Sequence, residues 1–203
     1  MKGLFIINPS SGKQINQGKA IQTITELLRD GVIDEATVFY TKAKDDAKNR
    51  TIQASKEDYD FVVAVGGDGT VNEVVAGLYI TGSKMPMAIM PSGTTNDFAT
   101  SVGIAPTVIG LYYLIKDFNV VPTDIGCFNE KDYFLNVAAG GILSEVAHNV
   151  SIESKTMLGK TAYITSGMKT IAEKGFKTTR LLFEIDGVKE EIDVYFFILA
   201  NSK

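Results

Sequence analysis

The sequence contains few of the residues that hold metals or cross-link a chain. Its 203 residues include one cysteine, Cys127, one histidine, His148, and no tryptophan. A single cysteine cannot form an internal disulfide, and two such residues are too few for a cysteine–histidine metal site. The composition therefore excludes disulfide scaffolds and zinc ribbons, and it suits the reducing cytoplasm.

A membrane-spanning run and an excess of positive charge are also lacking. No apolar segment approaches the roughly 18 residues that cross a bilayer, and Leu4–Ile7 is too short for the apolar region of a signal peptide. The net charge is −4, so no overall basic field would recruit nucleic acid. We expect no nucleic-acid partner. If the substrate is a lipid, the protein must visit the membrane surface.

The most informative feature that is present is a glycine-rich turn between a strand and a helix. The apolar run Phe61–Val65 predicts a buried parallel strand, and the string Gly66–Thr70 leads from it into a helix expected over Thr70–Ile80. Glycines let the backbone approach an anion, and a helix N-terminus offers free N–H groups. The turn therefore predicts a phosphate site. A carboxylate there, Asp68, indicates a bound Mg²⁺, a ribose hydroxyl or a proton in transit.

Purely structural interpretations of this turn stay open. Thr70 and Glu73 have the spacing of a capping box, and the glycines could serve only to permit positive φ. Asn72 stands where a dinucleotide-binding fingerprint would have its third glycine, and no GxxxxGK[ST] string exists. The turn is thus neither a Rossmann fingerprint nor a Walker A loop.

Strands and helices alternate along residues 1–117, which predicts a doubly wound α/β layer. Strands are expected at Leu4–Ile7, Thr37–Tyr40, Phe61–Val65 and Met87–Met90, and helices at Gly18–Arg29, Asp45–Lys56 and Thr70–Ile80. Parallel strands place their following loops along one sheet edge, where such folds bind ligands. We therefore expect a nucleotide crevice formed by the loops Asn8–Lys13, Gly66–Thr70 and Ser92–Asp97.

Beyond about residue 120 the pattern changes to short strands and hairpins. The dipeptide Asp186-Gly187 is a strong signal for a two-residue hairpin turn, and a helix is expected over Leu158–Glu173. Strands are expected at Asp124–Phe128, Tyr133–Ala138, Arg180–Ile185 and Val188–Ala200, with Tyr195–Leu199 buried in a sheet centre. These patterns predict an α/β domain over residues 1–120, followed by an antiparallel β-sandwich domain over residues 121–203.

Three motifs in this order resemble the diacylglycerol kinase catalytic-domain family, which includes bacterial soluble lipid kinases and sphingosine kinases. They are INPSSGK from Ile7, GGDGTVNEVVAGL from Gly66 and PSGTTNDFA from Pro91. The resemblance continues through Asp124–Gly126, Tyr133–Gly141 and Leu158–Tyr163. It implies an enzyme that uses ATP and Mg²⁺ to transfer the γ-phosphoryl group to a lipid hydroxyl, with diacylglycerol giving phosphatidic acid. NAD kinases share the GGDGT string and form the alternative enzyme class, and a nucleotide-binding module without turnover is a third reading.

The resemblance also implies roles for individual residues. Asp68 is expected closest to the metal and the reacting phosphate, with Asp97 and Asp124 shaping the active site; helix capping by Thr94 and Asp97 is the alternative for that loop. Contacts to ATP are expected from Asn8, Pro9, Ser10, Ser11, Gly12, Thr41, Gly66, Gly67, Asp68, Gly69, Thr70, Val71, Asn72, Glu73 and Thr94. In the family, the general base and a structural metal site come from sequence beyond the position of Lys203. We therefore expect an incomplete β domain and an inactive 203-residue chain.

The membrane contact and the oligomeric state have weaker signals. Residues 153–180 form a basic island with interleaved apolar residues, containing Lys155, Lys160, Lys169, Lys174, Lys177 and Arg180. Such a segment can contact the anionic inner face of a membrane, although a core-facing helix with solvated lysines fits the same pattern. The lipid alcohol is not specified by the sequence. A homodimer stays open.

Overall fold

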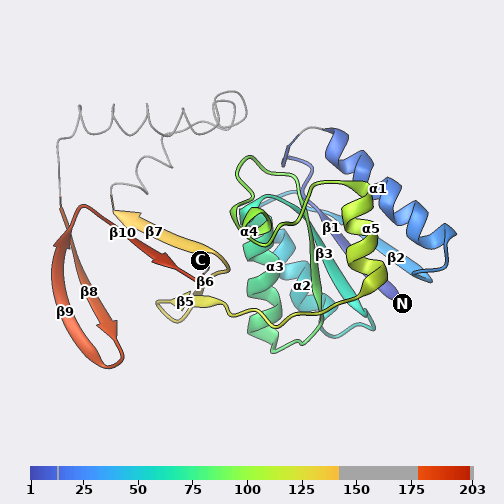
Figure 1. The fold of residues 1–203 in the computed structure, drawn as a ribbon. Helices are drawn as coiled ribbons and strands as arrows, with labels where there is room; N and C mark the ends of the chain where they lie inside the picture. The colour runs from blue at the N-terminus through green and yellow to red at the C-terminus, as the bar shows by residue number, and fades with distance from the viewer. Residues whose placement is uncertain (13, 142–177, 202–203) are drawn as a thin grey trace. The chain divides into compact units, whose positions relative to one another are not determined.

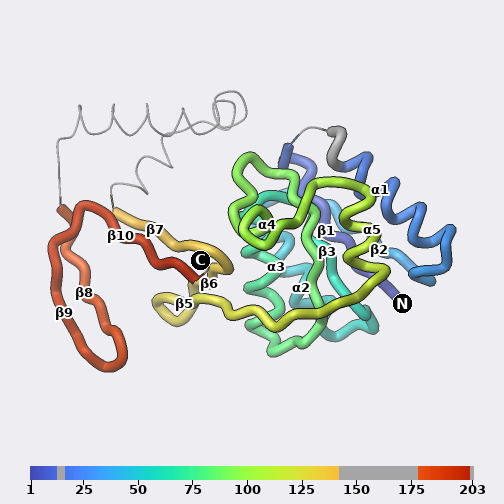
Figure 2. The backbone as a smooth tube through the Cα atoms, viewed as in Figure 1, coloured from blue at the N-terminus to red at the C-terminus, as the bar shows by residue number. Residues whose placement is uncertain are grey.

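The computed structural model describes residues 1–12, 14–141 and 178–201 (Figures 1 and 2). The chain divides into two compact units. The first comprises Met1–Asn136 together with the residues from Asn201 onward, and the second comprises Val137–Ala200. The domain limits predicted from the sequence, 1–120 and 121–203, stay predictions.

A four-stranded parallel sheet forms the centre of the first unit, with the strand order β2-β1-β3-β4 (Figure 1). Every residue of β3 is buried, and so are the last five of β1. Strands covered on both faces read as continuous apolar runs, which explains why these two were evident in the sequence. The strands are β1 (Lys2–Ile7), β2 (Glu35–Tyr40), β3 (Phe61–Gly66) and β4 (Met87–Pro91).

Helices cover both faces of this sheet and enclose two separate apolar cores. Alternate residues of β1 point to opposite faces: Leu4 and Ile6 join the core under α2 and α3, whereas Phe5 and Ile7 join the core under α1 and α5. This is the predicted doubly wound arrangement. The helices are α1 (Gln14–Arg29), α2 (Asp46–Ala54), α3 (Asp68–Thr81), α4 (Asp97–Ser101) and α5 (Val108–Asp117). The sequence analysis did not single out α5, whose first turn is capped by the Thr107 side chain.

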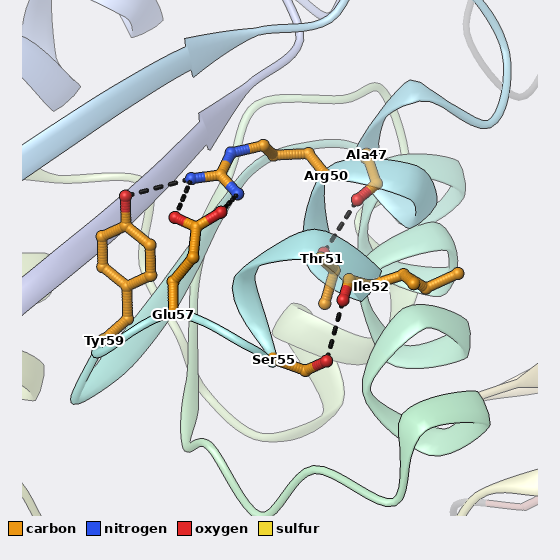
Figure 3. A network of polar contacts seen from close by, with 7 residues as sticks. All are labelled: Ala47, Arg50, Thr51, Ile52, Ser55, Glu57 and Tyr59. Carbon is orange, nitrogen blue, oxygen red and sulfur yellow. Dashed lines mark hydrogen bonds and ion pairs between the residues drawn. The ribbon is translucent and has the colours of Figure 1, made fainter.

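Polar contacts anchor the end of α2 far from the glycine-rich turn (Figure 3). The guanidinium of Arg50 donates two hydrogen bonds to the Glu57 carboxylate, at 2.8 and 2.9 Å, and a third to the hydroxyl of Tyr59 at 3.0 Å. The guanidinium holds the pKa of Glu57 below its ordinary value. On the same helix, Thr51 donates to the carbonyl of Ala47 and is fully buried.

Short antiparallel pairs follow the parallel layer. The hairpin of β5 (Gly126–Phe128) and β6 (Asp132–Phe134) belongs to the first unit, where the rings of Tyr133 and Tyr79 of α3 lie 4.8 Å apart. In the second unit, β8 (Thr179–Ile185) pairs with β9 (Val188–Val194), and β7 (Val137–Gly141) pairs with β10 (Phe196–Ala200). An α/β layer followed by antiparallel strands confirms the predicted fold class.

Three predictions for the strands in this region are wrong. The run expected as one strand over Tyr133–Ala138 is divided at residues 135 and 136, with β6 bonded to β5 and β7 bonded to β10. The run expected as one strand over Val188–Ala200 is divided at Tyr195, with β9 bonded to β8 and β10 bonded to β7. The run Tyr195–Leu199 is not uniformly buried, because Tyr195, Phe196 and Ile198 are about half exposed. Among the described strands, β10 has β7 as its one neighbour, so its apolar composition does not correspond to a covered position. By contrast, Asp186 and Gly187 both have positive φ, as the predicted hairpin requires.

Several expectations lie outside the described residues. These are the helix over Leu158–Glu173 and the motif Leu158–Tyr163. Of the basic island over residues 153–180, only residues 178–180 are described. Among the residues that the structure describes, none of the helices has the length and apolar character that spanning a bilayer requires.

The contact between α2 and α3 depends on the absence of a side chain at Gly77. A Cβ atom there would lie 2.7 Å from Cβ of Thr51 and 2.8 Å from the carbonyl oxygen of Lys48. Gly77→Ala is expected to lower the free energy of unfolding by about 1–3 kcal/mol, because both neighbours are held in a packed helix. Urea denaturation measures the change.

A matched control exists at Gly18, in the exposed face of α1. An added Cβ would meet no atom within 4 Å there, so Gly18→Ala is expected to raise stability by about 0.5–1 kcal/mol through helix propensity. Equal effects of the two substitutions would contradict the close packing of α2 on α3.

Candidate functional site

Three loops at the carboxyl edge of the sheet are held by hydrogen bonds that extend the strand ladder. The amide of Asn8 donates to the carbonyl of Val65 at 2.9 Å, and that of Thr41 donates to Ile7 at 3.0 Å. The amide of Ser92 likewise donates to Gly66 at 2.9 Å. The first residue after each of β1, β2 and β4 is therefore fixed by a neighbouring strand. The edge predicted to bind a ligand has a defined backbone.

The side chain of Asn8 joins the first loop to α3. Its Nδ2 donates to Oγ1 of Thr70 at 3.0 Å, and its Oδ1 accepts from the amide of Ser10 at 2.9 Å. Thr70 is buried and is the third residue of α3, which begins at Asp68 after the N-cap residue Gly67. The capping box proposed for Thr70 and Glu73 is therefore wrong, because the helix starts earlier and Thr70 bonds to a different segment.

Glu73 caps a different helix from its own. Its carboxylate accepts from the amides of Asp45 and Ala47, both at 3.1 Å, at the start of α2. The carboxylate of Asp46 accepts from the amides of Lys42 and Ala43 at 2.7 and 2.9 Å, and these bonds hold its pKa below the ordinary value. The N-terminus of α2 is thus already occupied by the carboxylate of Glu73, and the carboxylate of Asp46 holds the loop that precedes the helix.

The three glycines of the β3–α3 turn differ in the space around them, and Gly67 is the one packed closely against another loop. A Cβ on Gly67 would lie 3.1 Å from Cα of Gly93 and 3.5 Å from Oγ of Ser11, and a Cβ on Gly93 would lie 2.6 Å from Cα of Gly67. The φ of Gly67 is −90°, so positive φ is not the reason for glycine there. A Cβ on Gly66 would collide with the Thr70 side chain, whereas at Gly69 it would meet no atom within 4 Å.

The loop after β4 approaches the start of α3 through Asp68. The hydroxyl of Thr95 donates to Oδ2 of Asp68 at 2.9 Å. Asn96 has a φ of 50° and is the N-cap of α4, with Asp97 as the first helical residue. The capping box proposed for Thr94 and Asp97 is wrong as well, because α4 begins three residues after Thr94.

Asp124 lies in the segment before β5, where its side chain is exposed. Its main-chain carbonyl accepts a hydrogen bond from the Asn201 side chain at 2.7 Å. Asp68, Asp97 and Asp124 do not form a joint metal cluster: in the described part of the chain, no group of three or more histidine, cysteine or acidic side chains is placed to hold an ion.

A pocket of about 250 Å³ opens beside the β1 and β2 loops. Its lining combines predicted residues with four that the sequence analysis did not name, all from the segment after β2. The predicted lining residues are Asn8, Ser10, Thr41, Thr70 and Glu73, and the others are Lys42, Ala43, Lys44 and Ala47. The prediction of Thr41 was the available signal for these four, since they follow it directly in sequence.

Other predicted contact residues have protein partners away from this pocket. Val71 is buried in the core under α2 and α3, and Oδ1 of Asn72 accepts from the amide of Leu135 at 3.2 Å. Pro9 accepts from the Gln17 side chain through its carbonyl, Gly12 has a φ of 76°, and Thr94 is exposed.

The cap that Glu73 provides to α2 can be tested directly. Glu73→Gln leaves an amide NH₂ group facing backbone donors, so we expect a loss of about 1–2 kcal/mol of stability. We also expect faster hydrogen exchange at the amides of Asp45 and Ala47. Glu26→Gln, on the half-buried side of α1, is the control and should change neither, because glutamine can still accept the hydrogen bond from Gln22. A stable variant with unchanged exchange would show that the cap contributes nothing.

This chain is similar to bacterial diacylglycerol kinases. The family model for the diacylglycerol kinase catalytic domain matches residues 2–128. A diacylglycerol kinase of Bacillus subtilis is 34% identical over 201 residues, covering 98% of this chain and 65% of that protein. One from Staphylococcus haemolyticus is 32% identical over 198 residues, covering 98% of this chain and 59% of that protein.

A solved structure shows the same fold. The crystal structure of a diacylglycerol kinase from Bacillus anthracis superimposes with a TM-score of 0.73 at 26% identity, covering 99% of this chain and 64% of that one. The chain thus spans about three fifths to two thirds of the length of these relatives. Because the family model matches well over half of its residues, this chain belongs to the diacylglycerol kinase catalytic-domain family.

Proposed function

We propose that this chain forms the ATP-binding part of a lipid kinase that transfers the γ-phosphoryl group of ATP to a lipid hydroxyl. The lipid that we propose is diacylglycerol, with phosphatidic acid as the product, because the relatives are named diacylglycerol kinases. The lipid would be met at a membrane surface. Phosphoryl transfer requires mainly positioning and neutralisation of charge, which a preformed loop edge can provide.

One contrast carries the proposal. Two helices begin at the same sheet edge, and the N-terminus of α2 is filled by the carboxylate of Glu73. The N-terminus of α3 has no cap from a described side chain, and the residue before it is Gly67. The carboxylate in the first turn of α3, Asp68, accepts from the Thr95 hydroxyl. A helix N-terminus with close-packed glycines, whose own carboxylate is bonded to another loop, favours an external anion. We place the ATP phosphates there.

The residues at this edge also fit magnesium that arrives with the nucleotide. Mg²⁺ usually keeps several waters and takes one or two carboxylates together with substrate phosphates. A single carboxylate beside the phosphate site, Asp68, matches that requirement, and Thr95 orients it by donating at 2.9 Å. When bound, the ion would neutralise charge on the phosphates. In this proposal Asp97 and Asp124 lie on the side from which the lipid approaches.

The remaining part of ATP would extend toward the pocket beside the β2 loop. Asn8 and Thr41 follow β1 and β2 at the carboxyl edge of the sheet, and both also line this pocket. The main-chain amide of each donates a hydrogen bond to a neighbouring strand. Lys42 and Lys44 add positive charge to the same wall. The pocket is smaller than a complete nucleotide site, so we assign it only a part of the molecule.

Substitution of Asp68 tests the reaction. In the full-length gene product, Asp68→Asn should lower transfer of labelled phosphate from ATP to diacylglycerol by at least about 100-fold, since it removes a charge where electrostatic stabilisation dominates. The melting temperature should stay nearly unchanged, because asparagine can still accept from Thr95. Transfer to NAD in place of diacylglycerol would indicate an NAD kinase. ATP binding without any transfer would indicate a regulatory module.

Gly69 separates ligand binding from folding. Its Cβ position is open within the protein, so Gly69→Val should leave unfolding nearly unchanged while blocking an anion that contacts the helix end. We expect ATP affinity, measured by titration calorimetry, to fall at least about 30-fold. Gly18→Val is the matched control in an equally open helical position. Unchanged ATP affinity in Gly69→Val would remove α3 from the nucleotide site.

A further inference from the structure

Two asparagine side chains hold the backbone of Leu135 at both of its polar groups. Oδ1 of Asn72 accepts from the Leu135 amide at 3.2 Å, and Nδ2 of Asn201 donates to the Leu135 carbonyl at 2.9 Å. The side chain of Leu135 is 3% exposed and packs in the core that contains Val71 and Val74 of α3. Both the backbone and the side chain of Leu135 are therefore held in place beside α3.

Asn201 connects Leu135 to Asp124. Its Nδ2 also donates to the carbonyl of Asp124 at 2.7 Å, and its own amide donates to the carbonyl of Asn136 at 2.8 Å. An asparagine amide has two donor hydrogens, and both are used on main-chain carbonyls here. Asn201 thus cross-links Asp124 and Leu135 from a position 77 and 66 residues away in the chain, respectively.

Few other contacts described for Asp124 hold its backbone in position. Residues 119–125 are in neither helix nor strand, and the side chain of Asp124 is exposed. The next residue, Ile125, packs at the margin of the core that contains Leu135. Apart from that packing, the contact described for Asp124 that joins it to a distant segment is the hydrogen bond from Asn201.

These contacts form a continuous path between two carboxylates. Asn72 follows Asp68 by four residues on α3, so the two side chains share a helix face. The path runs from Asn72 through the Leu135 peptide and Asn201 to the backbone of Asp124. All of its members belong to the first compact unit.

We propose that Asn201 is a positioning residue that holds Asp124 in a set relation to Asp68 during phosphoryl transfer. The proposal rests on the function proposed above, in which both carboxylates serve the active site. The amide is suited to this role because it supplies two donors from one rigid group. Serine offers a single donor, and aspartate would place a carboxylate against two carbonyl oxygens.

The test compares Asn201→Ala and Asn201→Asp with Asn119→Ala in the full-length gene product. Asn119 is an exposed amide on the segment between α5 and β5 and serves as the matched control. Hydrogen exchange reports on the peptides that contain Ile125 and Leu135. Initial rates with ATP and diacylglycerol give kcat and KM, and circular dichroism with ATP calorimetry shows whether each variant is folded.

We expect Asn201→Ala to exchange faster in the peptide that contains Ile125, because the neighbouring Asp124 carbonyl loses its donor. We also expect a loss of about ten-fold or more in kcat, because misplacement of a catalytic group by about 1 Å costs rate. The KM for ATP should stay within about two-fold, since the phosphate edge of α3 keeps its own contacts. Asn201→Asp should show a larger loss in kcat, and Asn119→Ala should match the parent. The kcat loss without a KM change distinguishes positioning from general destabilisation.

Two results would overturn the proposal. One is a folded Asn201→Ala that keeps the kcat of the parent, and the other is unchanged exchange in the peptide that contains Ile125. A parent protein that binds ATP but never transfers phosphate contradicts the proposed function instead, and exchange in the Ile125 peptide then decides by itself whether Asn201 holds the Asp124 segment.

Discussion

The structure depends on the first two turns of α3, whose polar side chains bind four separate segments of the chain. The helix follows β3, a strand buried along its whole length, so its start is placed by the centre of the sheet. Each successive polar side chain then reaches a different loop. The pairs are Asp68 with Thr95, Thr70 with Asn8, Asn72 with Leu135, and Glu73 with the amides of Asp45 and Ala47.

Because the side chains of α3 bond to other segments, the N-terminal amides of this helix are available for the proposed ligand. Its N-terminus is left to glycine and main chain. The closest inter-loop approach, between Gly67 and Gly93, brings two loops together where a Cβ atom would separate them. In the proposed site, an anion would contact a surface whose geometry was set during folding, and preorganised donors need no rearrangement at the moment of reaction.

Much of the α/β layer could be predicted because local pattern and tertiary position agree there. The runs at β1 and β3 are apolar since both faces are covered, and parallel pairing requires the helices between them. Local pattern no longer predicts the structure where the extent of a strand depends on which strand it pairs with. The apolar run Val188–Ala200 is compatible with one long strand, but its two halves bond to β8 and β7. Nothing local marks Tyr195 as the point of division.

The sequence by itself determined the order of strands, glycine loops and helices, the family resemblance, and the sheet edge at which the three loops lie. Only the tertiary structure decided which groups meet there. Thr70 and Glu73 have the spacing of a local cap, yet they bond to residues 62 and 28 positions away. The spacing of residues in the sequence shows which donors and acceptors are close along the chain. Hydrogen bonds form between the donors and acceptors that folding brings close in space. For the same reason Asn201 beside Asp124 had no signal in the sequence.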